Sequence, residues 1–353
     1  QTTGAFVDMS TFTLSATVRN NDHTKALQFL GGSLGCLMSE GRVYLSNIEC
    51  ERVSYLGRTE AMLERFLPWE KRVMRYEQGF GYESGSLEGN FVSSSIDAQG
   101  TAEEPISLTS SIDVESGEGM PGQWGGLIVL GNAPSNKCPS DGSDCALQVE
   151  GAEEGAVFGG TDAADSSGTL RYVRVLNGGF EIAPDNELNG ITFGGVGSGT
   201  TVEYIQVHNN SDDGIEMFGG NVNFKYVVLT NMQDDSIDWD NGYQGKLQYV
   251  LVRQNPDNSD ANRGIEADND GSNPAAEPMS SPTLANLTII GNTFAGEDSS
   301  EGIYLREGTQ ATFYNTIVSG PAGMGECLEV ESNPVSQGHL QDGGISMTHS
   351  VMA

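Results

Sequence analysis

The strongest constraint on this chain is a repeat of about 22 residues in its second half. The lines VEYIQV, FKYVVL and LQYVLV share one pattern, and their tyrosines, Tyr204, Tyr226 and Tyr249, lie 22 and 23 residues apart. A second motif, built around an isoleucine, recurs with spacings of 24, 22, 28 and 38 residues. Its copies are NGITFGG, DDGIEMFGG, DDSIDWDNG, NRGIEADND and SEGIYLREG, with their isoleucines at Ile191, Ile215, Ile237, Ile265 and Ile303.

This period predicts an all-β fold in which each coil has three short strands and three turns and stacks on the next as a parallel β-helix. A single coil cannot cover its own apolar side chains, so it buries them against the coils above and below. The longer spacings indicate loops, which we expect at residues 256–264 and 268–282, on either side of the Ile265 motif. A column of amides, five residues after each aligned tyrosine, is expected to form a hydrogen-bonded ladder. Its members are Asn177, Asn209, Asn231 and Gln254, with Asn292 in the following coil.

Two regions are expected along the chain. Residues 96–353 carry the repeats and are predicted to form the β-helix. Residues 1–95 do not repeat, and the apolar residues between 62 and 74 follow a roughly helical spacing interrupted by Pro68. We expect an amphipathic helix there that caps the open end of the solenoid. The strand pattern runs to Ala353 without a polar cap, so we expect further coils or a partner beyond it.

The charge excludes one class of partner. The 353 residues contain 17 Lys+Arg and 49 Asp+Glu, giving a formal net charge of -32. Residues 101–353 hold 8 of those bases and 37 of those acids. A chain so negative is not expected to bind nucleic acid. No run of 18 apolar residues is present, so no membrane-spanning helix is predicted.

The cysteines and the first residue favour an oxidising compartment. Cys138 and Cys145 enclose a short Pro/Gly/Ser/Asp loop, which predicts a loop-closing disulfide. Cys36 and Cys50 could pair and leave Cys327 unmatched, an alternative that the sequence leaves open. The chain starts at Gln1 without a charged leader, as expected after removal of a signal peptide. We therefore expect a secreted or surface protein.

Several phrases resemble one known family. GQWGGLIVLGNAP, SGTLRYVRV, NGITFGGVGSGTTVEYIQVHNNSDDGIEMFGG and DDSIDWDNGYQGKLQY are similar to a widespread, mostly uncharacterised family of secreted or lipid-anchored bacterial surface proteins. That family has pectate-lyase-like, right-handed β-helix folds. The resemblance covers about residues 100–353 and implies the right-handed fold and a location on the bacterial outer surface.

The repeat also places acidic residues in register. A 22-residue offset puts Asp212 over Asp234 and Asp213 over Asp235. Because side chains alternate along a strand, the acids that follow the inward-facing isoleucines should point outward together. The candidate metal ligands are Asp212, Asp213, Glu216, Asp234, Asp235, Asp238, Asp240, Glu266 and Asp268.

Stacked acids need compensation. Like charges on coils about 4.8 Å apart repel by roughly 3 to 4 kcal/mol at an effective dielectric of 20, or about 1 kcal/mol in water. Calcium suits clustered carboxylates, because it accepts six to eight oxygen ligands in flexible geometry. The alternative is that the acids are solvated and helped by Arg263 and Arg306, which fall in the columns of Asp235 and Asp268.

A catalytic alternative rests on a second resemblance. DDGIEM followed by QDDSIDW is similar to successive coils of the polygalacturonases, which implies that Asp213, Asp234 and Asp235 act on a glycosidic bond. Arg263 stands where that family has the histidine of its G-H-G motif. A pectate-lyase-like elimination would need calcium and an arginine base, for which Arg263 or Arg306 could serve. Phe218 is a candidate platform for stacking on a sugar ring.

The sequence therefore favours a non-catalytic extracellular scaffold, stabilised by calcium. Its expected roles are adhesion, matrix or filament assembly, or glycan binding. The partners expected are further copies of the chain, a surface assembly or a polysaccharide. The alternative function is a polysaccharide lyase or a polygalacturonase-like glycoside hydrolase.

Overall fold

The computed structural model divides the chain into two compact units, residues 1–81 and 82–353. Within the first unit, β1 (Glu40–Leu45) and β2 (Ile48–Ser54) pair as an antiparallel hairpin. The helix expected between residues 62 and 74 lies outside the described residues. The structure describes residues 40–45, 48–54, 90–93, 96–139, 145–149, 156–182, 188–256, 263–292, 300–322 and 324–353.

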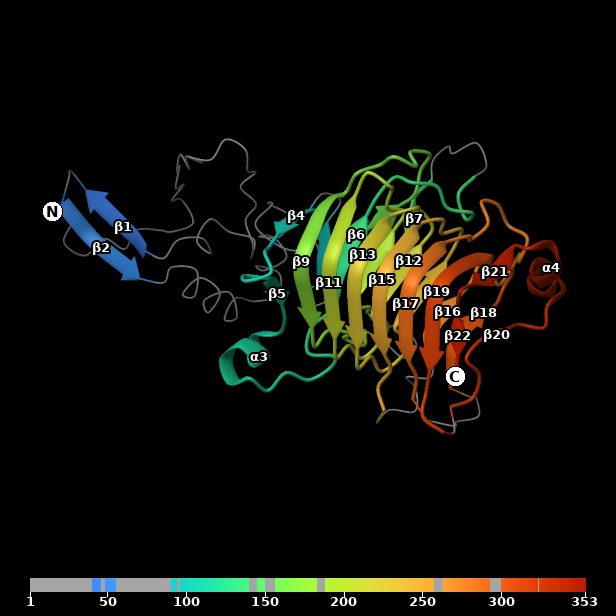
Figure 1. Cartoon of the computed structure of the whole chain (residues 1–353). Helices are drawn as coiled ribbons and strands as arrows, with labels where there is room; N and C mark the ends of the chain where they lie inside the picture. The colour runs from blue at the N-terminus through green and yellow to red at the C-terminus, as the bar shows by residue number, and fades with distance from the viewer. Residues whose placement is uncertain are drawn as a thin grey trace. The chain divides into compact units, whose positions relative to one another are not determined.

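The second unit is a right-handed parallel β-helix, as predicted (Figure 1). From β9 to β21, successive strands alternate between two parallel sheets. The first described strand of the solenoid is β3, just before the expected start at residue 96. The eight-stranded sheet contains β3 (Asn90–Ser93), β6 (Gly126–Leu130), β10 (Ile191–Gly194), β12 (Ile215–Phe218), β14 (Ile237–Asp240), β16 (Arg263–Ala267), β18 (Glu301–Leu305) and β20 (Glu329–Val330).

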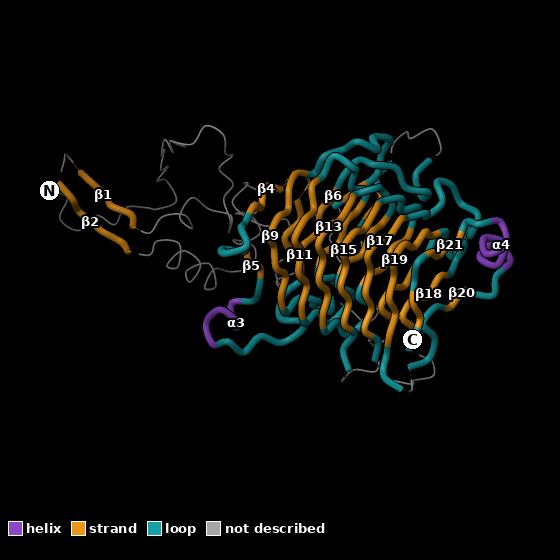
Figure 2. Tube along the Cα trace, in the orientation of Figure 1, coloured by secondary structure: helices purple, strands orange, loops and turns teal. Residues whose placement is uncertain are grey.

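The ten-stranded sheet runs along the solenoid, and its strands lie side by side across the view in Figure 2. From β10 to β21, each strand follows a strand of the other sheet in the chain, so the polypeptide winds once per pair. Its strands are β4 (Ile96–Gln99), β5 (Ile106–Leu108), β9 (Gly168–Leu176), β11 (Thr201–His208), β13 (Asn223–Thr230), β15 (Lys246–Arg253), β17 (Thr283–Ile290), β19 (Ala311–Ser319), β21 (Ile345–Thr348) and β22 (Val351–Met352).

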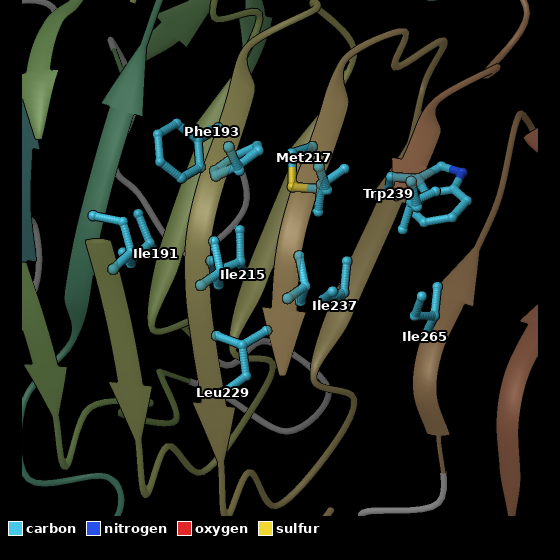
Figure 3. Packing of buried hydrophobic residues seen from close by; sticks show 14 of the residues in the cluster. Ile191, Phe193, Ile215, Met217, Leu229, Ile237, Trp239 and Ile265 are labelled. Carbon is cyan, nitrogen blue, oxygen red and sulfur yellow. The ribbon is translucent and has the colours of Figure 1, made fainter. Parts of the chain in front are cut away.

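The core lies between the sheets and consists of columns of equivalent residues. Ile191, Ile215, Ile237 and Ile265 occupy one column and are buried (Figure 3). Two residues further along each strand, Phe193, Met217, Trp239 and Ala267 form a second buried column in which large and small side chains alternate in volume. Each coil therefore covers the apolar side chains of its neighbours, as the repeat requires.

A left-handed residue divides each long strand in two. In β11 this residue is Tyr204, with φ 57°, and the pairing with β13 skips it. Glu203 and Tyr204 consequently both face outward, while Val202 and Ile205 are both buried. One strand of the ten-stranded sheet thus supplies two of the three extended segments expected in each coil.

The amide ladder is present in the first coils where it was predicted. Asn209 donates to the Asn177 side-chain oxygen and Asn231 to that of Asn209, each at 2.7 Å. Asn292 instead donates to the main-chain oxygen of Asn255 at 2.9 Å. The strand register pairs Ile290 with Arg253, so Gly291 occupies the position that follows Gln254 in the ladder, and the predicted place of Asn292 was wrong by one residue.

Among the described residues of the β-helix, two helices and an antiparallel pair of strands interrupt the repeat. Helix α3 (Ser111–Ser116) and helix α4 (Pro334–Asp342) were not expected from periodicity, because both are short. Each has a side-chain N-cap, Ser110 or Asn333, and ends at a left-handed glycine. The antiparallel pair β7 (Leu147–Gln148) and β8 (Val157–Phe158) lies in the segment after β6.

Candidate functional site

The predicted acidic columns form on the outer side of the eight-stranded sheet. Strands β12, β14 and β16 lie side by side, and their register places Glu216 beside Asp238 and Asp238 beside Glu266. The stacking of these acids in neighbouring coils is therefore confirmed. It follows from strand alternation, because the isoleucine before each acid is buried in the core.

A second column lies two residues before the isoleucines, where the turn enters the sheet. Asp213 and Asp235 occupy it, and the Asp235 N–H donates to Asp213 Oδ1 at 3.0 Å. Their side chains are buried, with Asp235 only 3% exposed. Asn189 stands at the equivalent place in the preceding coil and donates to Glu216. Asn189 was not among the predicted site residues, although NGI, DGI and DSI share one position of the repeat and mark it in the sequence.

Burial and mutual repulsion oppose the charged form of these acids. The pKa of Asp213 is raised well above its usual value by burial and by the charge of Asp212. The pKa of Asp235 is raised by burial and by Asp234. The pKa of Asp238 is raised by burial and by Glu216 and other acids. Among the described residues, Asp235 Oδ1 and Asp238 Oδ1 are buried without a hydrogen-bond partner.

Two groups of these acids have the geometry of a cation site. In the first, Asp213, Glu216 and Asp238 bring one carboxylate oxygen each to within 4.8 Å of one another. In the second, Asp212 and Asp234 do the same with Asp213. All the donors are oxygens, which suits calcium, and the unpartnered oxygen of Asp238 fits a ligand position.

A third group of acids was not anticipated. Glu301, Glu326 and Glu329 also place one oxygen each within 4.8 Å of the others. Glu301 continues the column of Asp235, which the SEGI motif marks in the sequence. The other two belong to a stretch of the last coils that does not repeat, so periodicity gave no signal for them.

Two arginines neutralise the acids of the later coils. Arg263 Nη1 lies 2.8 Å from Glu266 Oε1, and its Nε lies 3.5 Å from Glu301 Oε2. Arg306 Nη2 lies 2.7 Å from Glu266 Oε2, and its guanidinium contacts both oxygens of Asp268 at 2.7 to 2.9 Å. The predicted help from these two arginines is therefore present at Glu266 and Asp268.

These ion pairs keep both arginines in the protonated, cationic form. Although burial opposes it, Asp235 and Glu266 raise the pKa of Arg263, and Asp268 raises that of Arg306. Arg263 also stacks on the Tyr304 ring, 5.0 Å from its centroid. Both guanidinium groups are held as cations among carboxylates, which opposes a role as the base of an elimination reaction.

The remaining candidates occupy the margins of the site. Asp234 is exposed, and Asp212 is half-buried. Asp240 is half-buried and accepts a hydrogen bond from the Asn241 N–H, and burial raises its pKa to about 7. Phe218 points outward but is half-buried, and its ring packs near that of Phe158 with centroids 6.2 Å apart. That contact occupies part of the ring surface proposed for sugar stacking.

The predicted disulfide joins Cys138 to Cys145, with their Cα atoms 5.2 Å apart. Cys327 is free and half-buried, and its thiol lies near the Val318 carbonyl. The suggested pair of Cys36 and Cys50 cannot be followed, because Cys36 and the side chain of Cys50 lie outside the described residues.

The comparison with protein families agrees with this architecture. The family described as pectate-lyase-like β-helix domain matches residues 92–352, which is most of the chain. No curated protein and no solved structure matches this chain. Neither of the described helices has the length and hydropathy needed to cross a membrane. With its two parallel sheets and its stacked coils, the chain belongs to the pectate-lyase-like β-helix domain family.

Proposed function

We propose that this β-helix is a non-catalytic extracellular scaffold whose acidic columns are bridged by calcium. One observation carries the proposal: the register of the columns places carboxylates on adjacent coils within reach of a common cation, and one of the buried oxygens, Asp238 Oδ1, has no hydrogen-bond partner. An extracellular location is supported by the Cys138–Cys145 disulfide, since such bonds persist in oxidising compartments.

Calcium would be held first by Asp213, Glu216 and Asp238, which come from two successive coils. Asp212 and Asp234 supply a second group of oxygens on the adjoining turns. A divalent cation bound there offsets the repulsion between the coils and replaces the missing hydrogen bonds. The acids further along, Glu266 and Asp268, already have their arginines.

A polysaccharide hydrolase is the second candidate. It is favoured by one observation: Asp213, whose pKa is raised well above its usual value, lies beside the exposed Asp234, with two of their oxygens within 4.8 Å. Two carboxylates with different environments can divide the roles of acid and base. The burial of Asp235 opposes this candidate, because a side chain 3% exposed does not reach a glycosidic oxygen. A lyase is less favoured still, because both arginines are ion-paired.

The calcium proposal is tested by thermal unfolding. At a free concentration 100 times its Kd, calcium should stabilise the protein by about 2.7 kcal/mol relative to chelator. For a domain of this size that is a rise in Tm of about 5 to 11 °C. Asp238→Asn should lose most of the rise, whereas Glu104→Gln, an exposed acid outside the columns, should keep it. Equal melting curves in calcium and in chelator would contradict the proposal.

The catalytic alternative has a separate test. The intact protein and the Asp234→Asn, Asp235→Asn double variant are incubated with a panel of acidic and neutral polysaccharides, and new reducing ends and unsaturated products are measured. We expect no cleavage by either protein. Cleavage by the intact protein that the double variant lacks would replace the scaffold with the enzyme.

A further inference from the structure

The outer face of the ten-stranded sheet has a charge opposite to that of the rest of the molecule. Strands β9, β11, β13, β15, β17 and β19 together contain one acid, Glu203, although the chain has 49. That acid is paired with Arg171 at 2.5 Å. Five of the 8 bases within residues 96–353 lie on these strands, at Arg171, Arg174, Lys225, Lys246 and Arg253. We call the outward side chains of these six strands the basic face.

A row of tyrosines runs along the basic face. Tyr172, Tyr204, Tyr226 and Tyr249 stack in order, with ring centroids 4.2, 4.5 and 5.1 Å apart and planes within 18° of parallel. The faces of the inner rings are therefore taken up by their neighbours. What these rings offer to a ligand is their edges and hydroxyl groups.

A groove lies against this row. Its volume is about 480 Å³, and the tyrosine row lines it together with Arg174, Gln206, Val228 and Leu251. The lining extends from β9 to Asn286 on β17, which is four strand spacings, or about 19 Å at about 4.8 Å each. That length holds about six residues of an extended polypeptide at about 3.3 Å per residue.

Exposed apolar side chains continue the surface beyond the groove. Thirteen large hydrophobic side chains are exposed in the described part of the chain, and seven of them lie on strands of the ten-stranded sheet. Tyr249 and Leu251 line the groove itself, and Ile290, Tyr314 and Ile317 lie beyond it. Aromatic residues and arginine are enriched at protein interfaces, whereas acids are depleted, and the basic face has this composition.

We propose that the basic face docks an extended, acidic polypeptide segment that carries apolar side chains. The acidic groups would meet the five cations, and the apolar groups would lie in the groove beside the tyrosine row. A second copy docked through the same face is disfavoured, because it would set five cations against five. A sugar chain is disfavoured because the inner tyrosine faces are not free for stacking.

The net charge of -32 does not prevent such binding. At physiological ionic strength the Debye length is about 8 Å, so a ligand lying in the groove responds mainly to charges on its own face. The acidic columns belong to the other sheet. The inference therefore goes beyond the calcium proposal and is independent of it.

The probe for the test is a fluorescein-labelled random copolymer of glutamate and tyrosine in a 4:1 ratio, with binding measured by fluorescence anisotropy. The measurement is made both in calcium and in chelator, so that failure of the ion site does not affect its reading. We expect saturable binding that weakens at least tenfold between 50 and 300 mM salt, roughly as electrostatic contacts are screened. The variant Lys225→Gln, Arg253→Gln should weaken binding about tenfold, because it removes two cations of the basic face, the half-buried Lys225 and the exposed Arg253.

Control variants distinguish binding by the basic face from an effect of the net charge of the protein. Lys137→Gln removes a cation that pairs with Asp270, away from the basic face, and should change the affinity less than about twofold. Leu251→Asp should weaken binding of the copolymer, and unchanged melting curves would show that the variants fold. Equal affinity of the intact protein and the double variant would overturn the proposal. So would equal binding of polyglutamate without tyrosine, or binding of polygalacturonate in preference to the copolymer.

Discussion

At equivalent positions of neighbouring coils, the eight-stranded sheet carries Glu216, Asp238 and Glu266, whereas the ten-stranded sheet carries Tyr204, Tyr226 and Tyr249. Both columns repeat one kind of side chain at the spacing of the strands. For the tyrosines this spacing allows rings to stack, with centroids 4.2 to 5.1 Å apart along the row. For the acids the same spacing brings like charges together. A solenoid thus amplifies both the favourable and the unfavourable property of a repeated residue.

The largest effect is expected from removing a cation from the acidic side. Arg306→Met leaves Asp268 without its bidentate partner and Glu266 with Arg263 alone, and should lower the free energy of unfolding by about 2 to 4 kcal/mol. Lys225→Met on the basic face is the matched change and should cost less than about 1 kcal/mol. Urea unfolding of both variants measures the difference. Equal losses of unfolding free energy would show that a cation stabilises the acidic side no more than it stabilises the basic face.

The pH dependence should come from the acidic side. Burial raises the pKa of Asp240 and of Glu266 to about 7. These carboxyl groups hold their protons more tightly in the folded state than in the unfolded state. Their contribution to the free energy of unfolding is therefore fully present below about pH 4 and is lost as the pH rises to about 7. In chelator, the free energy of unfolding should fall by about 1 to 3 kcal/mol over this window. A profile that rises from pH 4 to 7 would contradict the assignment.

The tyrosine row gives the next prediction. Tyr226→Ala removes two ring stacks and should cost about 1 to 3 kcal/mol of unfolding free energy. Tyr226→Asn removes the same stacks, but asparagine tolerates the left-handed backbone at φ 61°, so it should cost less than alanine. Thermal unfolding ranks the two variants. If alanine and asparagine were equal, the backbone conformation would not contribute.

The smallest expected effect is an increase in stability rather than a loss. In chelator, Asp238→Asn removes one charge from the column of Glu216 and Glu266, and should stabilise the protein by about 1 kcal/mol. The exposed control Glu104→Gln should leave stability within about 0.5 kcal/mol. Melting curves without calcium measure both. Destabilisation by Asp238→Asn would mean that this carboxylate has a protein partner.

The repeat predicted the fold because one register fixes many residues at once. The isoleucine motif placed Ile215 and Ile237 in the core and Glu216 and Asp238 outside it, and the structure agrees. The amide ladder was predicted on the same grounds. Helices α3 and α4 were not predicted, because each is too short to give a periodic signal in the sequence. Only their capping residues mark them.

Properties that depend on contacts between distant segments could not be predicted. The outward position of Phe218 was deduced from alternation, but its contact with Phe158 depends on how a hairpin 60 residues earlier in the chain returns to the sheet. Likewise, the repeat placed Arg263 in the column of Asp235. Its ion pairs with Glu266 and Glu301 depend on the side-chain rotamers, which the repeat does not determine. The tyrosines were aligned as a column, but the groove beside them was not foreseen.

The left-handed tyrosine position limits how this solenoid can change its length. Tyr204, Tyr226 and Tyr249 each mark the same point in their coil, and pairing on both sides resumes at the next residue. Adding or deleting one residue inside such a strand would move the following side chains to the wrong face and break the contacts with both adjacent coils. Insertions are accommodated in the connecting loops, such as residues 268–282. Otherwise the molecule can be lengthened or shortened only by whole coils.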